Sequence, residues 1–170
     1  FVDLDELKEK VSEHKNNIAL ISIMHSNNEV ATMQDIDQVV KIAGNIPVHS
    51  DCVQSFGKVD LSFNKLGLTA ATISAHKIGG PLGVAALILK RGLDIEPVLH
   101  GGGQERDLRS GTFNVPGIIS FAAAAKNAVE NRKERELKVR ELKQELIETI
   151  KKNISDAWVN GDLDNSLPGI

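Results

Sequence analysis

The alternation of apolar, β-prone runs with helix-like segments is the feature that most restricts the fold of this chain. Strand-like runs lie at residues 18–24, 46–50 and 69–73, and helix-like segments lie at 3–15, 35–43 and 62–66. The run at 18–24 is apolar throughout most of its length, which suits a strand buried on both faces. Strand, helix, strand, helix and strand in succession predict a parallel sheet with helices packed on its faces.

A further apolar run at residues 83–89 follows the strand at 69–73 after only a short turn. A parallel connection needs a dozen or more residues, so this fourth strand is expected to be antiparallel to its neighbour. A glycine-rich loop at 101–112 precedes a segment typical of a helix from Pro116 to about Lys152. The predicted fold class is therefore α/β, with a mixed, mostly parallel sheet flanked by helices and a long connecting helix.

Composition indicates a globular protein, with 41% hydrophobic and 25% charged residues and a net charge of -3. No cluster of Lys and Arg indicates a nucleic-acid partner, and no apolar run approaches the ~20 residues of a membrane span. The single cysteine, Cys52, excludes an internal disulfide framework and favours a reducing compartment, so we expect a cytoplasmic protein. Because the chain starts within a helix-like segment and stops at residues 167–170, where a new apolar run would begin, we expect an internal section of a longer polypeptide.

Polar clusters directly follow three of the predicted strands, at residues 27–29, 51–54 and 74–77. Each cluster alone has an ordinary explanation as a turn, a helix cap or a surface lysine. Because the carboxyl ends of parallel strands meet at one edge of a sheet, the three together favour a ligand site. Asp51 and Lys77 at the ends of successive strands suit pyridoxal phosphate, since a lysine forms the Schiff base and an acid keeps the pyridine nitrogen protonated.

Five motifs make this interpretation specific: HSNNE at 25–29, HSDCVQS at 49–55, SAHK at 74–77, HGGGQE at 100–105 and LRSGT at 108–112. In order and spacing they resemble the cysteine desulfurases, class V enzymes of pyridoxal phosphate fold-type I. These enzymes serve iron–sulfur cluster assembly and tRNA thiolation. The resemblance implies that residues 1–129 are part of the large cofactor domain, 130–152 a connecting helix and 153–170 the start of the small C-terminal domain.

Carried over residue by residue, the resemblance assigns Lys77 to the Schiff base with the cofactor and to acid–base work at the α-carbon of the substrate. It implies that Asp51 pairs with the pyridine nitrogen and that Gln54 hydrogen-bonds the phenolic oxygen. Asn28 would contact the same side of the cofactor or the substrate carboxylate. Shortly after it, at residues 31–32, the chain has Ala-Thr where the family often has a glycine.

Ser74 and His76 resemble the phosphate ligands of the family. As residues i and i+2 of an extended segment, their side chains are expected to point the same way. His76 could instead be a structural histidine. Thr112 resembles the residue that reaches the phosphate in the neighbouring subunit, which implies a homodimer; alternatively, it only closes the glycine-rich turn. No metal ligands are expected.

Cys52 is expected to be a small buried residue and not the sulfur acceptor, because it follows Asp51 and consecutive side chains of an extended segment face opposite ways. The resemblance places the sulfur-accepting cysteine and the substrate-carboxylate arginine after Ile170. It implies removal of sulfur from L-cysteine to give L-alanine and an enzyme persulfide, which is passed to acceptor proteins; the fragment alone would be inactive. Another class V enzyme, such as an aminotransferase or a selenocysteine lyase, and a non-catalytic sulfur-relay scaffold stay open as alternatives.

Overall fold

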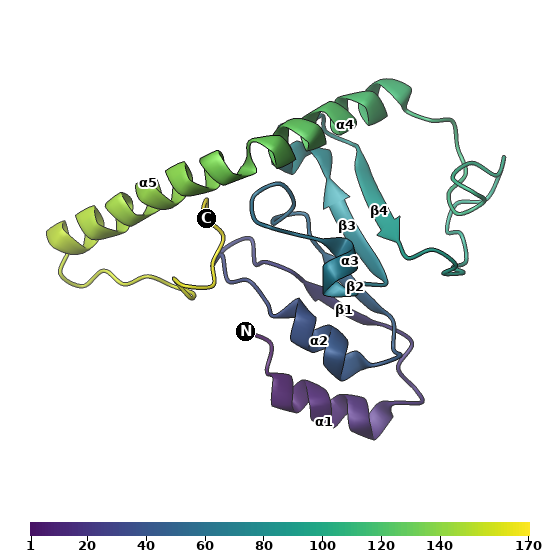
Figure 1. Ribbon diagram of the computed structural model, residues 1–170, viewed down its shortest axis with the longest axis horizontal. Helices are drawn as coiled ribbons and strands as arrows, with labels where there is room; N and C mark the ends of the chain where they lie inside the picture. Colours follow the sequence, from purple (N-terminus) through teal and green to yellow (C-terminus); the bar gives the residue numbers. More distant parts are fainter.

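The computed structural model describes residues 1–170, which build one four-stranded sheet (Figure 1). The strands lie side by side in chain order: β1 (Ile21–Met24), β2 (Val48–Asp51), β3 (Ala70–Ser74) and β4 (Ala85–Leu89). The first three are parallel, and β4 pairs with β3 in the antiparallel direction. The predicted mixed, mostly parallel sheet with a reversed fourth strand is confirmed.

Three helices precede the three parallel strands: α1 (Leu4–His14), α2 (Ile36–Ala43) and the short α3 (Phe63–Leu66). Their N-caps are Asp3, Asp35 and Ser62, whose side chains accept hydrogen bonds from backbone N–H groups of the first turn. All three helices lie where the sequence predicts them. Because each new strand is added on the same side of the last, right-handed crossovers place α2 and α3 on the same face of the sheet.

The helix-bearing face of the sheet holds the hydrophobic core. Ile23, Ser50 and Ala71 are neighbours across three strands and point to this face. The core joins them to side chains from three helices, among them Val39 of α2 and Phe121 of α4 (Val115–Glu130). One contiguous cluster of side chains therefore fixes the strands to the helices.

The opposite face of the sheet is open and polar. Ser22, His49 and Thr72 form a row across β1, β2 and β3, with 2.8 Å from Ser22 Oγ to His49 Nδ1 and 2.8 Å from His49 Nε2 to Thr72 Oγ1. The expectation that residues 18–24 form a strand buried on both faces is therefore wrong. The strand covers only Ile21–Met24, and Ser22 is exposed because every helix packed on the sheet lies on the other face.

Two glycines bring the segments after β2 and β3 close to α4. A Cβ atom added to Gly57 would lie 2.8 Å from Ala128 Cβ, and one added to Gly80 would lie 3.2 Å from Ala124 Cβ. Both distances are shorter than ordinary contacts between carbon atoms. Helix α4 therefore packs against both segments with almost no side chain between them.

The predicted helix from Pro116 to Lys152 is two helices, because α4 ends at Glu130 and α5 spans Arg132–Asn153. Between them Asn131 leaves the helical conformation, and its side-chain Nδ2 donates to the carbonyl oxygen of Asn127. Asparagine side chains compete in this way for backbone groups, which explains the interruption. Neither helix, nor any other in the structure, combines the length and apolarity needed to cross a membrane.

Helix α5 extends beyond the sheet, and the C-terminal segment returns beneath it toward the loop after β1 (Figure 1). Leu167 N donates to Ala31 O, and Lys143 Nζ of α5 donates to Leu167 O. Leu167 is fully buried against Ala31 and Val59. The last residues are thus tied to the large sheet domain in this structure, and the predicted division at residues 129, 152 and 153 stays a prediction.

Candidate active site

The carboxyl ends of β2 and β3 place two of the predicted site residues at one edge of the sheet. Asp51 is the last residue of β2 and Ser74 the last of β3. The register aligns Asp51 with Thr72, so Asp51 and Ser74 both point to the open face, two positions apart along the edge. A flat ligand lying on this face can therefore contact both side chains.

Asp51 is held in place by its own loop. Its Oδ1 accepts a hydrogen bond of 2.9 Å from Val53 N, and its backbone oxygen accepts from His25 N, which follows β1. The carboxylate is half-buried, and its second oxygen accepts no hydrogen bond from the protein. This carboxylate is oriented and retains an acceptor for a ligand.

Lys77 lies in η1 (Ala75–Ile78), a 3₁₀ turn that directly follows β3, where the sequence predicted a tight turn. The turn ends at Gly79 with φ +82°, a conformation that glycine adopts without strain. The side chain of Lys77 is exposed and lines a cavity of about 470 Å³, which Lys58 and Arg132 also line. The lysine is accessible on a short, backbone-bonded turn.

Ser74 and His76 lie together, although not for the reason predicted from the sequence. The expected extended segment is wrong, because Ser74 ends β3 and His76 belongs to the 3₁₀ turn. The turn nevertheless brings the side chains within hydrogen-bond distance, 2.8 Å from Ser74 Oγ to His76 Nδ1. One hydrogen is shared between the hydroxyl and a neutral imidazole, so the pair keeps one further O–H or N–H that can donate to an anion.

Gln54 lies in the turn after β2, and its Oε1 accepts a hydrogen bond of 3.2 Å from Lys58 Nζ. Burial first, and the positive charge of nearby Lys77 second, lower the pKa of Lys58 below its ordinary value. Lys58 is not among the residues predicted from the sequence, although it lies only four residues after Gln54. Lys58 is the residue that connects the turn carrying Gln54 with the cavity at Lys77.

Asn28 lies exposed in the loop after β1. The neighbouring Asn27 shapes this loop, because its Oδ1 accepts from Glu29 N and Val30 N at 2.8 and 2.9 Å. Ala31 has φ +64°, in the left-handed region that favours glycine. This conformation explains why a glycine suits this part of the loop in the resembled family.

Thr112 and its loop lie apart from the other candidates. The segment between β4 and α4 extends on the outer side of β4 (Figure 1), and Thr112 is exposed. Ser110 N donates to Leu99 O, and Gln104 Oε1 accepts from Gly111 N, so the loop is held by its own residues. Hydrogen bonds join Ser74 to His76 and Gln54 to Lys58, and Lys58 shares a cavity with Lys77, whereas Thr112 has no hydrogen bond to any of them.

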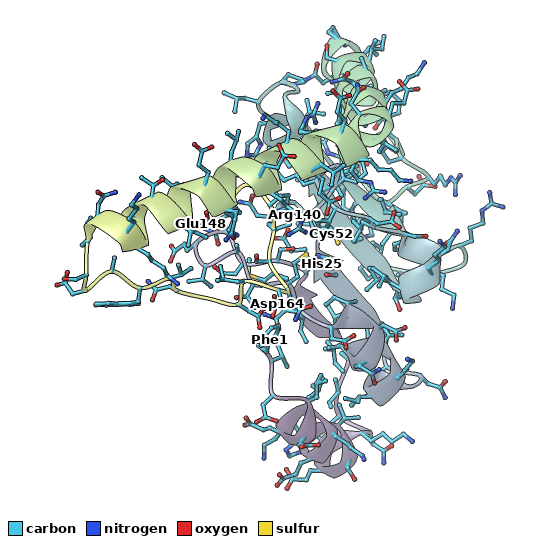
Figure 2. The ribbon with its side chains drawn as sticks, turned by 60° about the vertical axis from the view of Figure 1, so that its left-hand side comes forward. Phe1, His25, Cys52, Arg140, Glu148 and Asp164 are labelled. Atoms are coloured by element: carbon cyan, nitrogen blue, oxygen red, sulfur yellow. The ribbon has the colours of Figure 1, made fainter.

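Cys52 is fully buried in the core, as the sequence predicts. Burial raises the pKa of its thiol above the ordinary value of 9.0, so the thiolate is suppressed at neutral pH. Figure 2 shows Cys52 inside the molecule, with His25 nearby and Arg140 above them on α5. His25 and Arg140 line a second cavity, of about 560 Å³, that the sequence analysis did not anticipate.

The fold and this edge of the sheet define a class of protein. The chain belongs to the aminotransferase class-V family, whose model matches residues 1–165 and whose members depend on pyridoxal phosphate.

Within that family the chain is similar to cysteine desulfurases. An IscS-like cysteine desulfurase of Mycobacterium tuberculosis is 41% identical over 162 residues, covering 94% of this chain and 41% of the relative. Cysteine desulfurase IscS of Dictyoglomus turgidum is 40% identical over 170 residues, covering 99% of this chain and 42% of the relative. The chain therefore spans about two fifths of the length of these curated relatives.

Solved structures agree with this assignment. A NifS-like protein has a TM-score of 0.91 at 41% identity, covering 98% of this chain and 46% of that one. A second, SspA in complex with cysteine, has a TM-score of 0.69 at 34% identity, covering 74% of this chain and 36% of the other.

The side chains at the sheet edge fit pyridoxal phosphate. Asp51 offers a free carboxylate oxygen for a protonated pyridine nitrogen, and the hydrogen-bonded pair of Ser74 and His76 offers a donor for a phosphate. Lys77 offers an exposed amine for the aldehyde carbon. The chemistry of the donor set matches the group, and the role of each residue stays a prediction.

Proposed function

We propose that this chain is the cofactor-bearing part of a cysteine desulfurase, which converts L-cysteine and an enzyme thiol into L-alanine and an enzyme persulfide. The observation that carries the proposal is Lys77, exposed on a backbone-bonded turn directly after β3, beside the Ser74–His76 pair. The desulfurases named among its relatives support the choice of reaction within the family.

In this function each side chain of the site has a defined role. Bound pyridoxal phosphate supplies an electron sink for bonds at the α-carbon of the substrate. Lys77 holds the cofactor covalently and moves a proton at that α-carbon, while the carboxylate of Asp51 keeps a proton on the pyridine nitrogen. Ser74 and His76 bind the phosphate, and Gln54 and Asn28 orient the rest of the cofactor and the substrate.

The thiol that takes the sulfur lies elsewhere in the polypeptide in this proposal. An attacking sulfur must be accessible and ionised, whereas Cys52 is fully buried and its thiol pKa is raised by burial. The persulfide then delivers sulfur to acceptor proteins of iron–sulfur cluster assembly or tRNA thiolation. A cytoplasmic location, which the single buried cysteine favours, belongs to the same proposal.

We further propose that the protein works as a homodimer with Thr112 at the phosphate of the partner subunit. Support comes from the loop before α4, which carries exposed apolar side chains: Val98 is 91% exposed, and Leu99 and Phe113 are about half exposed. Exposed apolar side chains gathered along one segment mark interaction surfaces.

Lys77→Ala in the full-length protein tests the central assignment. Wild-type protein incubated with pyridoxal phosphate and reduced with borohydride should carry the cofactor on the peptide that contains Lys77, and the variant should lose both this adduct and alanine formation from L-cysteine. Lys65→Ala, at an exposed lysine of α3, is the matched control and should keep both. An adduct on another lysine in wild type, or alanine formation by Lys77→Ala, would overturn the proposal.

A further inference from the structure

Lys58 has only one protein partner for its ammonium group. The residue is part-buried in the turn after β2, and Nζ donates to Gln54 Oε1 at 3.2 Å. Lys58 makes no salt bridge to a carboxylate, and the cavity that it lines also receives Lys77, Arg132, Arg135 and one carboxylate, Glu136, which pairs with Arg132. Burial removes water from the Lys58 ammonium and the charge of Lys77 opposes it, so its bond to Gln54 is its main compensation.

This contact determines which way the amide of Gln54 faces. An ammonium group has three donors and no acceptor, so the atom of Gln54 that faces Lys58 is the carbonyl oxygen. The NH₂ group, which carries two donors, therefore faces away from Lys58. The reversed amide would place that NH₂ group against the ammonium. The two groups could then form no hydrogen bond, and the partially positive N–H hydrogens of the amide would face a cation.

The direction of this amide matters for the predicted task of Gln54. The phenolic oxygen of pyridoxal phosphate is an acceptor, so only the NH₂ side of an amide binds it favourably. We propose that Lys58 is a positioning residue that fixes the Gln54 amide with its NH₂ group free for the phenolic oxygen of the cofactor. The inference rests on the proposed function and adds to it a residue that does not itself touch the cofactor.

Backbone hydrogen bonds and one close contact hold the turn that carries Gln54 and Lys58. Phe56 N donates to Cys52 O and Lys58 N donates to Ser55 O, so the chain from β2 to Lys58 makes consecutive short turns. Gly57, directly before Lys58, is buried against Ala128 of α4. The backbone positions of Gln54 and Lys58 are therefore fixed relative to each other, and loss of the Lys58 amine removes the hydrogen bond that orients the Gln54 amide.

Binding of pyridoxal phosphate to the full-length apoprotein, followed by absorbance, measures the effect. Lys58→Met removes the donor and the charge at nearly equal size, and it should weaken cofactor binding about tenfold, as expected for one hydrogen bond to a charged group. Lys58→Arg keeps a charged donor and should restore most of the affinity. Lys65→Met, a change of the same kind at an exposed lysine, should bind like wild type.

A double-mutant cycle distinguishes positioning from a direct or purely structural role. If Lys58 acts through Gln54, then Lys58→Met in a Gln54→Leu background should cause no further loss of affinity. Gln54→Glu keeps a partner for Lys58 but replaces the NH₂ donor with an acceptor, and it should also bind the cofactor weakly. Gln54→Glu leaves Lys58 unchanged, so it provides a test of the amide orientation if Lys58→Met does not fold.

Each result supports or overturns the inference. Unchanged affinity in Lys58→Met, a tenfold loss that persists in the Gln54→Leu background, or wild-type affinity in Gln54→Glu would overturn it. Borohydride trapping on Lys77 in wild type keeps the two proposals apart. If trapping succeeds while Lys58→Met binds normally, only the role of Lys58 falls, whereas failure of trapping in wild type removes the proposed function itself.

Discussion

Gly57→Ala should destabilise the protein strongly, for two separable reasons. Gly57 has φ +72°, and an L-residue in the left-handed region costs about 1–2 kcal/mol. The added methyl group would also lie 2.8 Å from Ala128 Cβ and 3.2 Å from Ile78 Cγ2, and overpacking of this kind costs about 1–3 kcal/mol. The free energy of unfolding should therefore fall by about 2–5 kcal/mol.

Gly79→Ala is the matched control for the backbone part of this cost. Gly79 has φ +82° and ψ +15°, in the left-handed region, and an added methyl group there meets no atom within 4 Å. Its loss should be limited to about 1–2 kcal/mol, so the difference between the two variants isolates the packing term. Urea unfolding of the full-length protein, followed by circular dichroism at the helix band, measures both.

Ala128→Gly provides the second half of the test. Alone it should cost about 1 kcal/mol as a glycine in a helix, but in the Gly57→Ala background it removes the closest contact. The two substitutions should therefore couple by about 1–3 kcal/mol. Equal losses in Gly57→Ala and Gly79→Ala, together with simple additivity in the double variant, would refute the close packing of this turn on α4.

Three further outcomes follow from the site. Cys52→Ala should lose about 1 kcal/mol of stability and still form persulfide from ³⁵S-labelled L-cysteine; a folded variant without persulfide would show that Cys52 takes the sulfur. Burial lowers the pKa of His25 below 6.5, so unfolded protein binds this proton more readily and the free energy of unfolding rises with pH up to about 6.5. Urea unfolding between about pH 5 and 8 should show this slope, and His25→Asn should flatten it; an unchanged slope contradicts the assignment. Heterodimers of Thr112→Val and Lys77→Ala subunits should keep one site of normal cofactor affinity if sites are shared, and none if Thr112 serves its own subunit.

The direction of the strands was predictable because it follows from local patterns and one length. The apolar runs locate the strands, and residues 75–84 are too few for a parallel crossover. The burial of β1 on only one face was not predictable, because an apolar run in the sequence does not determine whether helices cover one face of the sheet or both. Asn131 breaks the long helix through its own side chain, a competition that helical periodicity does not register.

For the residues of the candidate site, the positions at the strand ends were predictable, whereas the contacts between their side chains were not. The sequence predicted Asp51, Ser74 and Lys77 at the carboxyl ends of strands, where the structure has them. The Ser74–His76 contact depends on a 3₁₀ turn that the sequence did not predict. Lys58 was missed because a lysine four residues after a glutamine is common on surfaces. Its meaning comes only from the cavity that it shares with Lys77.

The near absence of side chains between α4 and the two segments after β2 and β3 has a consequence for how sequences of this kind can vary. Ala124 and Ala128 are four residues apart on one side of α4, and their methyl groups set the distance from the helix to Gly80 and Gly57. A larger residue at either position would displace the segment that carries Lys77 or the one that carries Gln54, without touching any ligand of the site. Natural or engineered versions with every cofactor-facing residue intact can therefore still differ in cofactor affinity, and the difference would originate on the side of the helix that faces away from solvent.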